Sequence, residues 1–171
     1  MTLVQGFFIY FAVAMTVLAL LVVTRKSPMH SVLWMLAFFF HTAGLYLFLN
    51  AEFLAAAQII VYAGAIMVLF IFVIMLLNLK KEETERKLQK HWVAGLVVSL
   101  VLMAAMVKIL SGITVLPPLG EYSIQFVQLQ GNLMTIGKVL YTQYLLPFEI
   151  ASVVLLVAII GAVVLAKKRI L

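Results

Sequence analysis

The chain has 171 residues, of which 66% are hydrophobic and 11% are charged, and its formal net charge is +6. A soluble domain is nearer half apolar with about a quarter of its residues charged, and a disordered chain needs low hydrophobicity, so both classes are excluded. The composition therefore predicts an all-α integral membrane protein that forms a single transmembrane domain and faces lipid or other membrane proteins.

Five apolar stretches are long enough for helices that cross the hydrocarbon core, which needs about 20 residues. The first is too long for a signal-peptide core and lacks a basic region before it, so we interpret it as a retained span. A long loop over residues 111–144 separates the last two spans. In chain order the predicted spans are roughly residues 3–23, 31–49, 53–77, 92–110 and 145–166.

The basic residues predict the orientation of these spans. They gather at Arg25–Lys26, between Lys80 and Lys90, and at Lys167–Arg169, each at the end of an apolar run. Cytoplasmic loops have this excess of Lys and Arg, whereas a nucleic-acid site would show a continuous basic stripe. We therefore expect the N-terminus outside (periplasmic) and the C-terminus in the cytoplasm. We expect the spans to be surrounded by the lipid bilayer, and we expect no nucleic-acid partner.

The outer loop has two predicted elements of its own. The partly alternating run Ser123–Gln130 indicates a short extended segment. Asn132 is placed to cap a helix that would lie at the outer interface. Its apolar face would consist of Leu133, Ile136, Leu140 and Tyr144.

Few ionisable residues fall inside the predicted spans, and such residues are candidates for function. His41 lies near the middle of the second span. It would relay protons, or it would be a neutral imidazole bonded to a neighbouring helix. Glu149, in the first turn of the fifth span, would be an interface carboxylate or a proton carrier. So few groups cannot make an autonomous pump, and neither a metal-ligand spacing nor a catalytic triad is present.

The third span holds the most informative pattern. Gln58, Tyr62 and Ala65 follow at i, i+4 and i+7, which would place them on one helix face. The small residues Ala63 and Gly64, with Ala65, would let another backbone approach closely. They also leave room for a π-bulge, a local change of winding that is frequent at functional sites. The alternative is a packing face on which Tyr62 is bonded to a neighbour.

Three segments resemble one known family. The runs Gln58–Phe70 and Val73–Asn78 closely resemble the third span of the J subunit of proton-translocating NADH:quinone oxidoreductase, respiratory complex I. Mitochondrial subunit 6 is its counterpart. The runs Leu146–Ser152 and Leu155–Ala162 resemble the last span of that family, and Arg25–His30 resembles its first cytoplasmic loop. The resemblance covers all five spans in order.

The resemblance implies a subunit of the membrane arm in a bacterial inner membrane, packed against subunits of the A, H, K and N types. It also implies a chain without catalytic residues or a redox centre of its own. NADH, FMN, iron–sulfur clusters and quinone would be bound by other subunits. Alternatives are a purely structural scaffold in the same or a ferredoxin- or plastoquinone-linked complex, and an independent small transporter.

In the family the third span carries a π-bulge whose conversion to regular helix rotates the residues that follow. Some relatives have Glu where this chain has Gln58. An amide cannot carry a proton, so glutamine at this position favours a mechanism in which the chain gates a proton path over one in which the chain itself is protonated. If the roles in the family are carried over to this chain, the hinge would consist of Tyr62, Ala63, Gly64 and Ala65. The apolar gate beside it would consist of Val68, Leu69 and Phe72.

Overall fold

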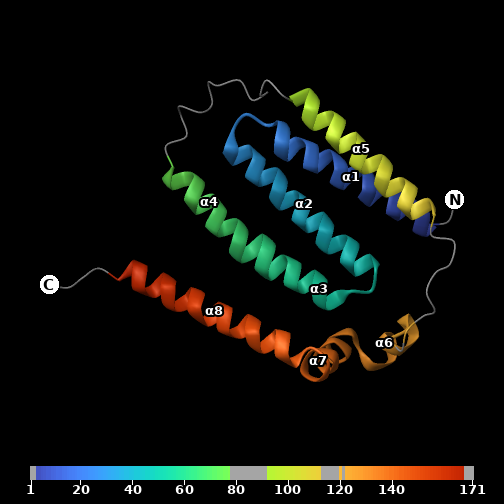
Figure 1. Ribbon diagram of the computed structural model, residues 1–171, viewed down its shortest axis with the longest axis vertical. Coiled ribbons are helices and arrows are strands. Elements are labelled where there is room, and N and C mark those ends of the chain that lie inside the picture. Colours follow the sequence, from blue (N-terminus) through green and yellow to red (C-terminus); the bar gives the residue numbers. More distant parts are fainter. Residues whose placement is uncertain (1–2, 78–91, 113–119, 121, 168–171) are drawn as a thin grey trace. The chain divides into compact units, whose positions relative to one another are not determined.

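The computed structural model describes residues 3–77, 92–112, 120 and 122–167 (Figure 1). Within these ranges every regular element is a helix, and no strand occurs. The elements form two compact units, Met1–Leu119 and Gly120–Leu171. The first unit holds α1 (Leu3–Thr24), α2 (Pro28–Phe48), α3 (Glu52–Ala57), the π-helix η1 (Gln58–Ile66), α4 (Met67–Leu76) and α5 (Trp92–Ser111). The second holds α6 (Ile124–Gln130), α7 (Asn132–Thr142) and α8 (Leu145–Ala166).

Five helical runs are long and apolar enough to cross a membrane. They are α1, α2, the continuous run Glu52–Leu76, α5 and α8. The all-helical class and the five membrane-length helices are therefore confirmed, whereas the side of the membrane that each terminus faces stays a prediction. The basic patch between Lys80 and Lys90, and the residues after Lys167, lie outside the described ranges.

Local sequence explains where α2 begins and how it joins α3. Pro28 occupies the first turn of α2, where its fixed φ suits a helix and its missing N–H costs no hydrogen bond. At the other end Asn50 has φ 58°, and asparagine tolerates this left-handed conformation better than most residues. The turn closes with a hydrogen bond of 2.8 Å from the Ala51 N–H to the Tyr46 carbonyl. The second and third spans are thus joined by a tight hairpin.

Helix α2 is the central element of the first five helical segments. It packs against α1 on one side and against α3, η1 and α4 on the other, as Figure 1 shows. Val32 and Ala43 of α2 are buried. Gly44 lies under the ring of Phe11 from α1, since a Cβ at this glycine would come within 3.2 Å of a ring carbon. Small residues therefore let α1 approach α2 closely, as is usual between membrane helices.

The prediction of an extended segment at Ser123–Gln130 is wrong, because α6 occupies Ile124–Gln130. The Ser123 hydroxyl oxygen accepts a hydrogen bond of 3.3 Å from the Phe126 N–H, so this serine caps the helix. Gly131 ends it with φ 85°. The helix cap at Ser123 and the helix stop at Gly131 outweigh an alternation of apolar and polar residues that was only partial.

Helix α7 forms where a helix was expected, but its cap and its inner face differ from the prediction. Gly131 precedes it as the N-cap, and Asn132 is already its first residue. Leu133 is exposed, and Tyr144 lies beyond the end of the helix. Ile136 and Leu140 are half-buried as expected, beside the buried Thr135. The inner face is therefore displaced from the leucine at the start of the helix to the threonine two residues later.

Replacement of Gly131 by alanine is expected to destabilise the second unit. At φ 85° and ψ 140° a side chain is strained, and such backbone costs about 1–3 kcal/mol. Gly137, inside α7, is the control, because a Cβ there meets no atom within 4 Å. We expect Gly131→Ala to lower the thermal stability of the purified chain and Gly137→Ala to leave it equal or higher. Equal thermal stability of the two variants would show that a side chain at residue 131 is not strained.

Candidate functional site

The third span contains a π-helical segment of nine residues, Gln58–Ile66, between two α-helical parts. Its wider winding is visible in the hydrogen bonds at its end, where the Met67 N–H points to the carbonyl of Tyr62, five residues back. Most π-helices are single-turn bulges that interrupt an α-helix, frequently at functional sites. This segment is therefore the most unusual backbone feature of the described chain.

The small residues in the segment are compatible with this winding. A Cβ at Gly64 would lie 3.3 Å from the carbonyl oxygen of Ile59, the residue five positions earlier, which is a tight contact. Glycine avoids that contact, and its neighbours Ala63 and Ala65 add only one carbon each. The segment thus combines a close internal contact with little side-chain bulk.

The burial pattern shows what the π-helix does to the face of the span that contacts α2. The buried residues are Ala55, Gln58, Ala63 and Met67, with exposed fractions of 2%, 8%, 9% and 1%. Successive steps along this face are three, five and four residues. Steps of three and four fit an α-helix, whereas the step of five from Gln58 to Ala63 does not. The segment therefore shifts the inner face by one residue.

This shift corrects the expected common face of Gln58, Tyr62 and Ala65. Gln58 is buried, but Tyr62 is 48% exposed and Ala65 is exposed. The expectation assumed α-helical spacing, which fails across a π-turn. Tyr62 still contacts α2 at the edge of the face, because its ring meets that of Phe39 edge-on with centroids 5.6 Å apart.

The three residues that the resemblance assigns to a gate lie just beyond the segment. Val68, Leu69 and Phe72, all in α4, are each more than half exposed. They lie away from the inner face that Met67 occupies, and on a membrane-embedded helix such positions contact lipid or another chain. Their role as a gate stays a prediction.

His41 lies at the contact between α1 and α2. Its Nδ1–H donates a hydrogen bond of 2.9 Å to the Ala37 carbonyl of its own helix. Its Nε2 is 3.2 Å from the Tyr10 hydroxyl of α1. The imidazole is thus engaged at both nitrogens, and the ring of Phe11 stands edge-on to it at 6.5 Å.

Glu149 lies on α8, whose described residues include no buried one. The helix begins at Leu145, so this glutamate follows the first turn instead of belonging to it, which corrects its expected place. Its backbone carbonyl accepts a hydrogen bond of 2.7 Å from the Ser152 hydroxyl. Among the described residues no three His, Asp or Glu side chains gather as metal ligands would.

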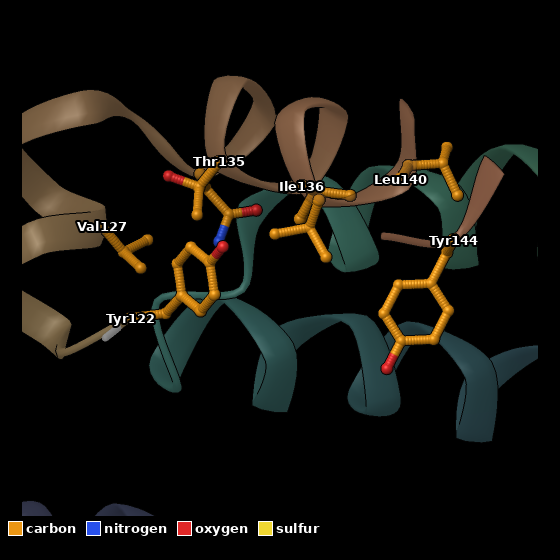
Figure 2. A pocket seen from close by; sticks show the side chains of 8 residues that line it. Tyr122, Val127, Thr135, Ile136, Leu140 and Tyr144 are labelled. Atoms are coloured by element: carbon orange, nitrogen blue, oxygen red, sulfur yellow. The ribbon is translucent and has the colours of Figure 1, made fainter. Parts of the chain in front are cut away.

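The second unit contains an apolar cavity of about 340 Å³ that the sequence did not indicate. Figure 2 shows Thr135, Ile136 and Leu140 of α7 along one side, with Val127 of α6 and Tyr122 at one end. The Tyr122 hydroxyl accepts a hydrogen bond of 3.4 Å from the Gln143 amide. The amphipathic pattern of α7 was the only signal that could have pointed to this cavity.

Comparison with known proteins gives a consistent result. The family described as NADH-ubiquinone/plastoquinone oxidoreductase chain 6 matches residues 18–165. NADH-quinone oxidoreductase subunit J of Rickettsia felis is 38% identical over 164 residues, which are 95% of this chain and 80% of that protein. The same subunit of Rhodobacter capsulatus is 37% identical over 179 residues, covering 99% and 84%. NAD(P)H-quinone oxidoreductase chain 6 of Leptolyngbya boryana is 39% identical over 150 residues, covering 88% and 73%.

Proposed function

Because the chain belongs to the NADH-ubiquinone/plastoquinone oxidoreductase chain 6 family, we propose that it acts as a J-type membrane subunit of a proton-translocating NADH:quinone oxidoreductase. Two observations support this proposal. The matched relatives are subunits of quinone oxidoreductases, and five helices of the chain are long and apolar enough to cross a membrane. A bacterial inner membrane is the location that fits both.

The subunit has no active site of its own in this proposal. NADH, FMN, iron–sulfur clusters and quinone belong to other subunits, and this chain contributes helices to the membrane arm. Exposed apolar surface favours partners there, because α5 and α8 contain no buried residue among those described. Subunits of the A, H, K and N types are the partners that we propose for these faces.

The step of five residues in the buried face of the third span supports a more specific role, that of a hinge. Conversion of the segment to a regular α-helix would turn everything after it by about 100°, the rotation per residue of an α-helix. If the part before Gln58 stays in place, Tyr62 and Ile66 would replace Ala63 and Met67 on the inner face. A small residue would thus be exchanged for a tyrosine beside α2.

The same rotation would carry the exposed residues of α4 to new positions. Val68, Leu69 and Phe72 would move relative to a neighbouring subunit, which would open or close an apolar barrier to water. Gln58 would bear no proton in this mechanism, because an amide has no titratable group near neutral pH. The chain would couple quinone reduction to proton translocation by changing the shape of a path whose proton carriers lie in partner subunits.

Purification of the tagged chain from its own membranes in mild detergent tests the subunit assignment. We expect an assembly that oxidises NADH and reduces quinone to co-purify with it. Recovery with a ferredoxin-linked assembly would change the electron donor, and recovery of the chain alone would contradict the proposal. Ion flux through the purified chain in liposomes would instead favour an independent transporter.

A further inference from the structure

The hydrogen bonds of His41 indicate which ring nitrogen carries a hydrogen. The Ala37 carbonyl can only accept, so Nδ1 must carry a hydrogen. A second hydrogen on Nε2 would make the ring a cation in the middle of a membrane span, which is costly. Nε2 therefore has a free electron pair, and the Tyr10 hydroxyl, 3.2 Å away, donates to it. Both nitrogens of a neutral imidazole are then satisfied.

The pair is flanked by aromatic side chains of α1 and α2, and Tyr10 is 55% exposed. The rings of Tyr10 and His41 have centroids 6.0 Å apart, and Phe11 packs beside both. Phe11 also contacts Phe48 at 6.3 Å, and Phe7 contacts Phe48 at 5.4 Å. Ring contacts alone tolerate sliding along a helix, whereas a hydrogen bond defines both the depth and the rotation of the two helices.

We propose that Tyr10 and His41 form a positioning pair that fixes α1 on α2, with His41 held as the neutral Nδ1–H tautomer. A proton relay would have to take a proton on one nitrogen and release it from the other. Nε2 is engaged by the Tyr10 hydroxyl, and Nδ1–H is donated to the Ala37 carbonyl, which is too weak a base to take the proton onward. His41 therefore stays a hydrogen-bond acceptor toward Tyr10 and does not carry protons.

The pair also has a consequence for the third span. His41 and Phe39 are two residues apart on α2, which places them about 200° apart around the helix axis. His41 accordingly contacts α1, while Phe39 contacts Tyr62 of η1. Helix α2 is held from both sides at nearly the same depth. The positioning role needs no hinge in η1, so the two proposals can fail separately.

Substitutions in the intact complex test the positioning role. Tyr10→Phe and His41→Phe each remove the hydrogen bond and keep the aromatic packing. We expect each to raise the rate of thermal inactivation about threefold, which is typical for loss of one hydrogen bond between membrane helices. The double variant should be no worse than either single variant. Thr16→Val is the control, because the Thr16 hydroxyl donates only within α1, to the Ala12 carbonyl at 2.7 Å.

His41→Gln distinguishes positioning from proton transfer. The glutamine oxygen can accept from Tyr10 but cannot carry a proton. Unlike His41→Phe, this variant is expected to be as stable as the parent, and we expect it to pump the same number of protons per electron. Loss of pumping in His41→Gln, with assembly intact, would overturn the proposal in favour of a relay.

Nitrogen-15 NMR of the histidine-labelled full chain in lipid nanodiscs gives a second measurement. The chain has three histidines, and the signals of His41 are those that disappear in His41→Gln. We expect one protonated and one unprotonated ring nitrogen, assigned as Nδ1 and Nε2. Tyr10→Phe should shift the Nε2 signal. A ring protonated on both nitrogens, or on Nε2 alone, would contradict the assignment.

Discussion

Replacement of Gly64 by valine is expected to depress coupled proton pumping about tenfold while NADH:ferricyanide activity stays near that of the parent. A Cβ at this position already comes within 3.3 Å of the Ile59 carbonyl oxygen in the π-helical form. Valine adds two further carbons, and such overpacking costs typically 1–3 kcal/mol. Since about 1.4 kcal/mol changes a ratio of two forms tenfold, the balance between π-helix and α-helix would shift by that order.

The control for this variant is Gly95→Val in α5, a helical glycine whose Cβ would meet no atom within 4 Å. It makes the same change in side chain and helix propensity without touching the π-segment. We expect its coupled activity to match the parent. An assembled Gly64→Val complex that turns over and pumps at the parental rate would contradict a hinge at this glycine. Failure to assemble, with no selective loss of coupling, would favour a purely structural subunit.

The helices of this protein could be predicted from the sequence because apolar length alone determines a membrane span. The predicted span at residues 145–166 coincides with α8, and the others differ by at most a few residues at their ends. The hairpin between α2 and α3 has a similar origin, since a conformation with φ 58° suits Asn50. Such features depend on a few adjacent residues, and no distant contact has to be known.

The candidate site could be located from the sequence but not described. The π-segment adds one residue to a single step of the inner face, from Gln58 to Ala63, and periodicity over so short a run does not reveal it. The assumption of α-helical spacing placed Tyr62 with Gln58, whereas Ala63 takes the inner position. The bond between Tyr10 and His41 joins residues 31 positions apart, so only the packing of two helices reveals it. The extended segment expected at Ser123–Gln130 failed for a different reason, since the cap at Ser123 and the stop at Gly131 decided the conformation of a weakly patterned segment.

Deletion of Val61 is expected to abolish coupled turnover while leaving assembly and NADH:ferricyanide activity intact. Val61 lies on the exposed side of η1, so its removal takes away no buried contact. The deletion shortens the step from Gln58 to Ala63 from five residues to four, which an ordinary α-helix accommodates. Gln58, Ala63 and Met67 would all keep facing α2. The third span would then be a regular helix without the extra residue that a hinge needs, and the loss of coupled pumping should exceed that of Gly64→Val.

A compensating insertion distinguishes loss of the hinge from general damage. An alanine inserted between Ala65 and Ile66 of the deletion variant restores the length of the segment, and we expect it to restore coupled pumping to within a few-fold of the parent. Infrared spectra or a structure of the assembled deletion variant would show whether the segment has become α-helical. If that variant is α-helical and still pumps at the parental rate, interconversion of the two windings is not part of the mechanism. Recovery of pumping by the insertion would tie coupling to the length of the segment, because the inserted alanine differs in identity and position from the valine that was removed.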